Sequence, residues 1–593
     1  MTPNRRPTAR RDNVVDTLHG VAIPDPYRWL EDGDDKETRA WTAAQNARTE
    51  ALLGAVPGRA ALETRLRDLL RVGTVGTPRV RGGRFFYQKR EGEQNQPILY
   101  ARDGVEGEER VVVDPNALDA AGLAALDWWE PSPDGRLVAH GVSRDGNEWS
   151  TLRVAEAETG RLLPDAIARC RYSSVAWLPD GSGFYYTRYP EPGSVPPGEE
   201  EYSSHAFFHR LGDDPAADPK VFGEGRSPQD MISLAISRDG RWLVATAFQG
   251  WARSEVFLRD LTWEDGPWVP VVEGEDARFD NAIPTADRLY LRTDRDAPNG
   301  RIVAVDPSSP APALERWETV VPERPERILE GFVLAGDRVV SHELESAASR
   351  LRLYGHDGTP RGELSLPGLA SVLGLDAEEE GDAVGVGVES FVAPPAAFVY
   401  DAASGERRVL SPLPPVAGFD PATVEVRQVR YPSKDGTPIP MFLVHRAGLL
   451  PSGDHPTVLT GYGGFNISRT PGYQAALPAW LERGGIFALP NLRGGGEFGE
   501  AWHRAGMLAN KQNVFDDFLT AAEWLIAEGY TNPERLAIWG GSNGGLLVGA
   551  AITQRPDLFR AAVCAVPLLD MVRYHRFRIA KLWIPEYGSA DDP

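Results

Sequence analysis

The feature that most constrains this chain is a short turn that recurs seven times in its middle. The turn is rich in aspartate and glycine, as in Pro133-Asp134-Gly135 and Pro179-Asp180-Gly181, and a short strand follows most copies. Seven repeats of roughly 40–60 residues, each with about four strands, predict a seven-bladed β-propeller. A β-sandwich would explain the strands but not their regular recurrence. The copies are marked by Gly83, Gly135, Gly181, Gly240, Asp287, Gly336 and Gly381, spaced by 52, 46, 59, 47, 49 and 45 residues.

The chain has a different pattern on either side of these repeats. Residues 1–70 carry helix formers with apolar residues near the helical period, over Glu37–Leu53 and Arg59–Leu70. After the prolines of Pro412–Pro421, strands alternate with helices, which predicts a mostly parallel sheet with helices on both faces. A chain of 593 residues is also too long for one core. We therefore expect a helical N-terminal segment over 1–70, the propeller over 71–422 and an α/β domain over 423–593.

A candidate nucleophile lies in the α/β part. Gly540-Gly541-Ser542-Asn543-Gly544 has the G-x-S-x-G pattern of a nucleophile elbow, in which a serine stands at the apex of a strand-to-helix turn. A buried strand over Leu536–Trp539 and a helix toward Thr553 provide the context that the motif requires. Glycines flank the serine because the turn is too tight for Cβ atoms. The alternative is an incidental serine in a glycine-rich turn.

The same region offers donors for an oxyanion. One is the backbone N–H of Asn543, directly after the candidate nucleophile. The other is expected from the glycine loop Gly461–Gly464, which follows the predicted strand Thr457–Thr460 and contains Tyr462. Both sites lie at carboxyl ends of strands, where ligands bind in such sheets. The alternative for Tyr462 is an aromatic side chain that only packs over the loop.

The base that should activate the serine is not found. In α/β-hydrolases the acid and then the histidine follow the serine along the chain. Only His575 follows Ser542, and just one strand fits between them, so we interpret His575 as structural. We expect the aspartate and histidine of the triad to lie beyond Pro593 and the sequence to be truncated there. A naturally inactive paralogue is the alternative.

Composition narrows the class of protein. The net charge of −22 argues against nucleic acid or an anionic membrane surface as partner. The sequence contains no run of 18 or more apolar residues, so we expect no membrane-spanning helix. The basic N-terminus is not followed by the apolar segment of a secretory signal. Two cysteines are too few for a disulfide framework or a zinc site. We expect a cytoplasmic monomer without metal or cofactor.

Several long motifs resemble those of the prolyl oligopeptidase family of serine peptidases, and they occur along the chain in the order found in that family. The resemblance covers nearly the whole chain and implies an α/β-hydrolase domain built from both chain ends. It also implies a propeller that covers the site and admits only short peptides. The motifs are Asp25-Pro26-Tyr27-Arg28-Trp29-Leu30-Glu31, Gly461-Tyr462-Gly463-Gly464-Phe465-Asn466, Asn491-Leu492-Arg493-Gly494-Gly495-Gly496-Glu497 and Gly540-Gly541-Ser542-Asn543-Gly544-Gly545.

The resemblance also implies roles for individual residues. Ser542 matches the nucleophile and Tyr462 the hydroxyl that binds the oxyanion. Asn543 matches a residue that gives an oxyanion N–H and a side-chain contact to substrate. Trp583 matches a ring that stacks on the substrate proline, although a core tryptophan is the alternative. The rest of that pocket corresponds to Phe465, Leu568 and Tyr587.

The predicted function follows from these matches. Gly-Ser-Asn and Gly-Gly-Phe-Asn are similar to the proline-specific branch of the family, and an apolar aromatic slot suits the flat ring of proline. We therefore expect a serine endopeptidase that cleaves short proline-containing peptides after proline through an acyl-enzyme. The alternatives are an oligopeptidase B-like peptidase of other specificity, an esterase, and an inactive peptide-binding scaffold.

Overall fold

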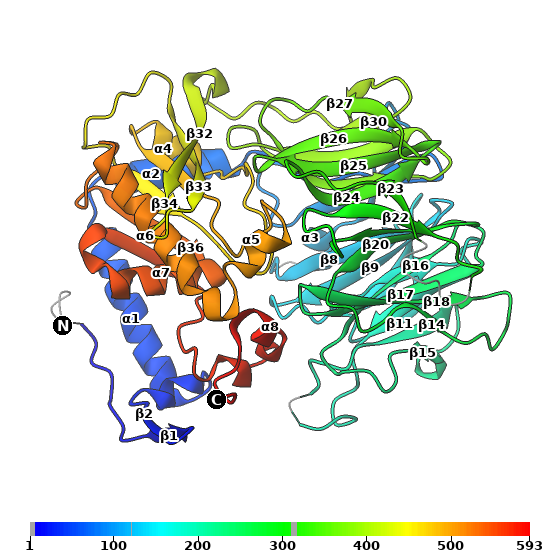
Figure 1. Ribbon diagram of the computed structural model, residues 1–593, viewed down its shortest axis with the longest axis horizontal. Coiled ribbons are helices and arrows are strands. Elements are labelled where there is room, and N and C mark those ends of the chain that lie inside the picture. The colour runs from blue at the N-terminus through cyan, green and yellow to red at the C-terminus, as the bar shows by residue number, and fades with distance from the viewer. Residues whose placement is uncertain (1–5, 120, 198, 310–316) are drawn as a thin grey trace.

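The computed structural model describes residues 6–119, 121–197, 199–309 and 317–593, and Figure 1 shows them as two bodies side by side. One body is a propeller formed by the middle of the chain. The other is an α/β body to which both ends of the chain contribute. The predicted combination of a seven-bladed propeller and an α/β-hydrolase domain is therefore confirmed.

The propeller consists, within the described residues, of seven antiparallel sheets, the first with five strands and the others with four. The first blade contains β3 (Thr74–Val75), β4 (Arg79–Arg81), β5 (Arg84–Arg90), β6 (Ile98–Asp103) and β7 (Arg110–Val113), and the short helix α3 (Pro115–Leu118) follows it. The second and third contain β8 (Ala124–Pro131), β9 (Leu137–Arg144), β10 (Thr151–Glu156) and β11 (Leu162–Ile167), then β12 (Val175–Trp177), β13 (Gly183–Arg188), β14 (His205–Arg210) and β15 (Lys220–Phe222). The fourth and fifth contain β16 (Met231–Ile236), β17 (Trp242–Gln249), β18 (Arg253–Asp260) and β19 (Val269–Val272), then β20 (Phe279–Pro284), β21 (Leu289–Thr293), β22 (Arg301–Val305) and β23 (Glu318–Val321). The last two contain β24 (Ile328–Ala335), β25 (Arg338–Glu345), β26 (Ala348–Gly355) and β27 (Pro360–Leu364), then β28 (Ser371–Ala377), β29 (Ala383–Glu389), β30 (Ala396–Asp401) and β31 (Arg407–Val409).

Each recurring turn of the sequence is a hairpin at the start of a blade. Between β8 and β9 the hydroxyl of Ser132 donates to Asp134, and the N–H of Gly135 donates to the Ser132 carbonyl at 2.8 Å. The turn between β16 and β17 repeats this arrangement with Ser237 and Gly240. Both glycines have positive φ, which explains why glycine recurs at this position.

The ring of blades closes where the seventh lies against the first. Asp376 on β28 accepts hydrogen bonds of 2.8 Å from the Val80 N–H and from the Arg81 guanidinium. On β29, a side chain at Gly385 would collide with the carbonyl of Pro78. Close backbone approach and a part-buried ion pair therefore join the two ends of the propeller.

The α/β body is organised around a six-stranded sheet in the order β32-β33-β35-β34-β36-β37. The last four strands in that order are parallel, and β32 and β33 form an antiparallel edge. This topology places the turn after β36 and the loop after β34 side by side. The elements are β32 (Val424–Pro432), β33 (Pro438–Arg446), β34 (Thr457–Thr460), α4 (Leu477–Leu481), β35 (Ile486–Pro490), α5 (Glu500–Arg504), α6 (Gln512–Ala527), β36 (Leu536–Gly541), α7 (Asn543–Gln554), β37 (Ala561–Ala565) and α8 (Ile584–Tyr587).

The main core lies between this sheet and the helices α6 and α7. Leu459 and Ile538 from the sheet pack with Phe518 from α6 and Leu547 from α7, all with at most 1% of their surface exposed. Burial of such side chains stabilises the body that carries the candidate nucleophile.

The N-terminal segment combines a hairpin with two helices. The helices α1 (Lys36–Gly54) and α2 (Arg59–Leu70) lie where the sequence predicts them, but β1 (Val15–Leu18) and β2 (Val21–Pro24) form a hairpin inside the segment predicted as helical. Gly20, with positive φ, allows the tight turn between these short strands. Residues 1–5 of the predicted segment lie outside the described residues.

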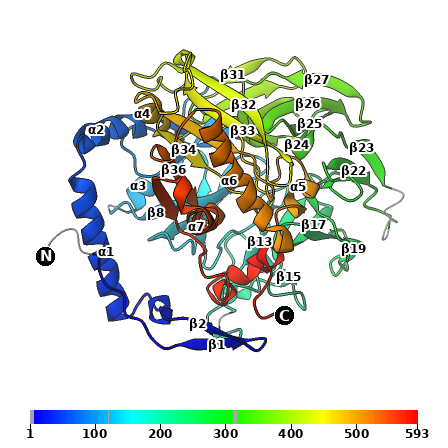
Figure 2. The same ribbon diagram turned by 60° about the vertical axis from the view of Figure 1, so that its left-hand side comes forward.

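This segment packs on the α/β body. Arg65 of α2 pairs with Glu482 next to α4, and Figure 2 shows α1 on the outside of the body, away from the propeller. Among the helices that the structure describes, none has the length and apolar character needed to cross a membrane.

Candidate active site

Ser542 stands at the apex of the turn between β36 and α7, in a backbone conformation that side chains rarely adopt. Its φ is 58° and its ψ is −121°. A Cβ at Gly540 would collide with the carbonyl of Gly544, and one at Gly545 would lie 2.7 Å from the carbonyl of Ala565. Gly540 and Gly545 are therefore sterically required, as expected for a nucleophile elbow.

The environment of Ser542 fits an attacking group. Asn543 is the first residue of α7, so its N–H has no acceptor within the helix and is available to a ligand at the helix N-terminus. The Ser542 N–H donates to the Ala565 carbonyl at 3.0 Å, which fixes the turn on β37. Among the described residues, the Ser542 hydroxyl has no hydrogen-bond partner.

The glycine loop after β34 folds tightly against the elbow. A side chain at Gly463 would collide with Val514, and Phe465 takes a positive φ of 60°. The side-chain amide of Asn543 donates a 2.5 Å hydrogen bond to the carbonyl of Tyr462. The two predicted sources of oxyanion donors are thus held directly against each other.

Asn543 also reaches the C-terminal side of the site. Its Oδ1 accepts a 2.7 Å hydrogen bond from the hydroxyl of Tyr587 in α8. Burial raises the pKa of Tyr587 well above its usual value, so the hydroxyl remains a donor. Both polar groups of the Asn543 side chain are engaged within the protein in this arrangement. Its predicted side-chain contact to substrate stays a prediction.

Aromatic rings form one wall beside this network. The ring of Phe465 lies edge to face with that of Tyr587, with 5.3 Å between centroids. Trp251 approaches Phe465 from the hairpin between β17 and β18 of the propeller, with 4.8 Å between centroids. No motif or periodicity in the sequence marks Trp251, because only the docking of the two bodies brings this turn to the site.

The other two predicted pocket residues lie on neighbouring segments. Trp583 directly precedes α8 and is half-buried, and within the described part of the chain its ring stacks on no other aromatic ring. Leu568 is half-buried in the loop after β37, next to Pro567, which packs against Gly545. Within the described residues, Phe465 contacts Tyr587 directly, whereas the ring of Trp583 stacks on neither of them.

The predicted motif 491–497 packs directly against the glycine loop. A side chain at Gly494 would lie 2.7 Å from the Gly463 carbonyl. Next to it the guanidinium of Arg493 donates to Asp517 at 2.6 Å and also to Asp435, in a largely buried cluster. This motif is therefore a structural support in the described residues.

His575 lies close to an acid. Its Nε2 is 2.9 Å from a carboxylate oxygen of Asp591, which also accepts from Arg576. The other ring nitrogen of His575, Nδ1, has no hydrogen-bond partner among the described residues.

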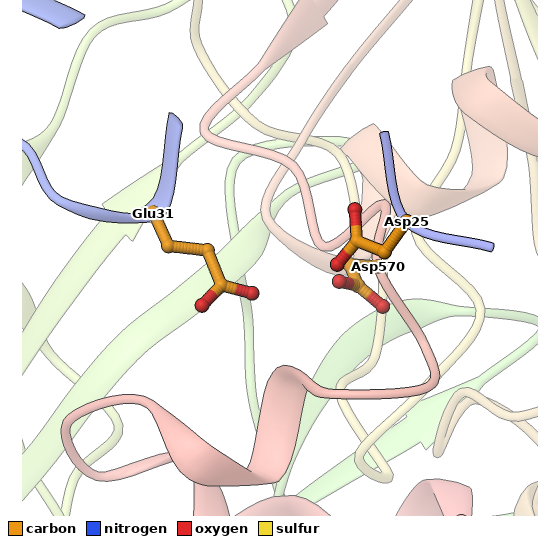
Figure 3. A group of neighbouring side chains, drawn as sticks. All are labelled: Asp25, Glu31 and Asp570. Carbon is orange, nitrogen blue, oxygen red and sulfur yellow. The ribbon is translucent and has the colours of Figure 1, made fainter. Parts of the chain in front are cut away.

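Three carboxylates come together where the N-terminal motif docks on the C-terminal part of the chain. Figure 3 shows Asp25 and Asp570 pointing toward one another, with Glu31 nearby. Arg28 donates to Asp25 at 2.5 Å, and Arg573 donates to Glu31 at 2.7 Å. Because Arg28 and Arg573 pair with Asp25, Glu31 and also Asp16, the group belongs to an ion-pair network that fastens the N-terminal motif to the C-terminal part of the chain.

Comparison with known proteins matches both bodies to one family. Residues 6–412 match the N-terminal β-propeller domain of prolyl oligopeptidase, and residues 472–593 match the prolyl oligopeptidase family. The chain belongs to the prolyl oligopeptidase family. Among its relatives is the prolyl endopeptidase of Elizabethkingia meningoseptica, 34% identical over 588 residues, which cover 99% of this chain and 82% of that protein.

Solved structures agree with this assignment. A structure from an analysis of two prolyl endopeptidases and of their inter-domain dynamics is 40% identical, with a TM-score of 0.94 over 99% of this chain and 86% of the other. Prolyl oligopeptidase B from Galerina marginata, bound to a 25-residue macrocyclization substrate, is 28% identical, with a TM-score of 0.93 over 100% of this chain and 86% of the other. The family resemblance seen in the motifs is thereby confirmed, and the family is one of serine peptidases.

Proposed function

We propose that this peptidase cleaves short peptides on the C-terminal side of proline, with Ser542 as nucleophile. The observation that carries the proposal is the hydrogen-bonded path from Tyr462 through Asn543 to Tyr587. It joins the candidate oxyanion loop, the residue after the nucleophile and the aromatic wall in one rigid unit. A substrate whose ring lies against that wall would present its carbonyl to Ser542.

The proposed chemistry is acyl transfer in two steps. The Ser542 Oγ forms a bond to the carbonyl carbon, the C–N bond breaks, and the serine proton passes through a general base to the leaving amine. Water then attacks the acyl-enzyme and releases the acid. In both steps the oxyanion would accept from the Asn543 N–H and the Tyr462 hydroxyl. The described residues place no base at the Ser542 hydroxyl.

The charges around the aromatic wall favour proline over a basic residue. A substrate lysine or arginine would need an acid that is free to pair with it. The acid next to Tyr587 is Glu586, and it is already bound by Lys511 at 3.1 Å and by His503 at 2.9 Å. An uncharged ring without an N–H fits such a wall better, which speaks against the oligopeptidase B-like alternative.

Further parts of the proposal concern substrate size, architecture and surroundings. Because Trp251 reaches Phe465 from the propeller, a substrate would bind between the two bodies, which suits short peptides. We divide the chain into 1–70, 71–422 and 423–593, which is supported by strands that begin at Thr74 and Val424.

We also propose that the protein is a cytoplasmic monomer. The free thiols of Cys170 and Cys564 suit a reducing compartment.

The test uses a fluorogenic Gly-Pro amide and protein made from the complete coding sequence. Wild type should cleave the substrate after proline, and Ser542→Ala should lower turnover by roughly 10³-fold or more. Activity that survives the substitution would remove Ser542 from its role. Preference for Arg or Lys before the scissile bond would favour the oligopeptidase B-like alternative, and turnover of esters alone would favour an esterase. Wild-type protein that binds peptides without cleaving them would support the inactive scaffold.

A further inference from the structure

Four charged side chains form a buried row behind the aromatic wall: Glu500, His503, Glu586 and Lys511. Glu500 and His503 belong to α5, Glu586 belongs to α8, and Lys511 directly precedes α6. The side chains of the first three are at most 9% exposed, and that of Lys511 is 13% exposed. Negative and positive groups alternate along the row, so His503 lies between the two acids and Glu586 lies between His503 and Lys511.

One end of the buried row holds the loop that carries Tyr462. The ammonium of Lys511 donates to the carbonyl of Gly463 at 2.9 Å and to Glu586 at 3.1 Å. A side chain at Gly464 would lie 3.0 Å from this ammonium. Lys511 therefore fixes the two residues that follow Tyr462, and its own position depends on Glu586.

His503 lies between the two acids. Its Nδ1 is 3.1 Å from Glu500, and its Nε2 is 2.9 Å from Glu586. A neutral imidazole has a single N–H, so its other nitrogen would face a carboxylate with a lone pair. Only the imidazolium satisfies both contacts. Burial opposes this charge, but the hydrogen bonds to the two acids raise the pKa of His503 to about 9.

The other charged groups around His503 do not replace it. Arg504 donates to Glu500 at 2.9 Å and lies near Asp276 of the propeller, so it stays at the outer end of the row. If His503 lost its proton, Glu586 would retain Lys511 as its only ionic partner among the described residues. The titratable or charged groups that face this part of the row are Glu500 and Arg504 from α5, Lys511 before α6, Glu586 and Tyr587 from α8, and Asp276 and Asp294 from the propeller.

We propose that the His503 imidazolium is a positioning residue of the active site, which holds Glu586 and Lys511 so that the Tyr462 loop keeps its oxyanion-binding shape. The inference rests on the proposed function, because it matters only if Tyr462 and Ser542 act on a substrate carbonyl. His503 touches no reacting atom. Loss of the His503 imidazolium should reduce kcat more than it changes KM, because oxyanion contacts are strongest in the transition state.

The experiment compares kcat and KM between pH 6 and pH 10.5 for wild type, His503→Gln and a matched control. Gln carries no charge and cannot donate to both acids as the imidazolium does. The control is His209→Gln, since His209 is equally buried between Asp165 at 3.0 Å and Asp218 at 2.9 Å, in the third propeller blade. A loss of stability alone would affect both variants alike.

His503→Gln should lower kcat about 10-fold at pH 7.5 with KM within about twofold, on the scale of one charge-assisted hydrogen bond. The wild-type kcat should fall as pH rises through about 9, and this alkaline fall should disappear in the variant. His209→Gln should retain the wild-type kcat and pH profile. If His503→Gln has wild-type kcat and the same alkaline fall, the proposal is wrong.

A second variant keeps the test decisive if His503→Gln does not fold. Glu586→Gln removes the carboxylate that His503 and Lys511 share, and it should reproduce the loss of kcat; wild-type kcat in this variant would overturn the proposal. Failure of the underlying function would look different, because Ser542→Ala would then retain turnover. Loss of activity in Ser542→Ala together with unchanged kinetics in His503→Gln and Glu586→Gln would refute the role of His503 alone.

Discussion

The hydroxyl of Tyr587 donates a 2.7 Å hydrogen bond to the side-chain oxygen of Asn543, so α8 is tied to the first residue of the helix that follows Ser542. Asn543 is 1% exposed, so water could not readily take the place of the Tyr587 hydroxyl as the donor to its side-chain oxygen. The bond therefore connects the shape of the aromatic wall to the position of the candidate oxyanion N–H.

Removal of this hydroxyl should affect both activity and stability. Tyr587→Phe leaves a buried acceptor unpaired, which typically costs about 1–3 kcal/mol. We expect kcat/KM for a proline substrate to fall about 10-fold and thermal stability to decrease. Tyr354→Phe serves as control, because this buried propeller tyrosine donates to Glu343 within its own blade at 3.0 Å. Equal kinetics in the two variants would show that the Tyr587 hydroxyl is dispensable.

Tyr462→Phe decides between the two roles considered for Tyr462. If the hydroxyl binds the oxyanion, its loss should lower kcat by about 10²–10³-fold and leave KM nearly unchanged. If the ring only packs over the loop, phenylalanine should preserve activity. Steady-state kinetics on the Gly-Pro amide separate these outcomes.

The backbone of Ser542 predicts opposite effects of its substitution on stability and on activity. Positive φ is strained for serine but not for glycine, and such strain costs on the order of 1 kcal/mol. Ser542→Gly should therefore abolish turnover and raise the melting temperature, whereas Ser542→Ala should abolish turnover without this gain. Calorimetry of the two variants measures the difference. An equal melting temperature would mean that the turn stores no strain at this residue.

Glu497 should make stability depend on pH. Burial raises its pKa from 4.5 to about 7, so between these values the folded state binds more protons than the unfolded chain. Its contribution to stability is therefore lost as pH rises through this range. Glu497→Gln should match wild type near pH 5 and be more stable at pH 8.5, by on the order of 1–3 kcal/mol.

Urea unfolding at the two pH values measures this effect. Glutamine can accept from the Arg469 N–H, as Glu497 does at 2.7 Å, and it can accept from the Asn491 amide, as Glu497 does at 3.3 Å. Glu534→Gln, which replaces an exposed carboxylate, serves as the control. A difference of the same size at pH 5 and pH 8.5 would contradict the assigned titration.

Local chemistry explains which parts of the structure could be predicted. The hairpin turns at Gly135 and Gly240 depend on residues only a few positions apart, so they can be recognised in the sequence. The same is true of the elbow at Ser542, where neighbouring glycines make the turn possible. The hairpin near Gly20 was missed because its strands are only four residues long.

Contacts between distant segments explain what could not be predicted. Trp251 reaches the site from a propeller turn, and His503 bridges acids that are 86 residues apart at Glu500 and Glu586. No periodicity or motif encodes such pairs, because docking of the two bodies and of α8 creates them. The roles of these residues therefore depend on tertiary structure.

The contact between Trp251 and Phe465 has a consequence for how this protein can diversify. The proposed pocket is shared between a body that carries the candidate nucleophile and a propeller loop that carries no predicted catalytic group. Mutations in that loop can reshape the fit of substrates while the elbow and its glycines stay untouched. Substitutions in the propeller can therefore change which peptides would bind, while the proposed catalytic residues of the α/β body remain unchanged.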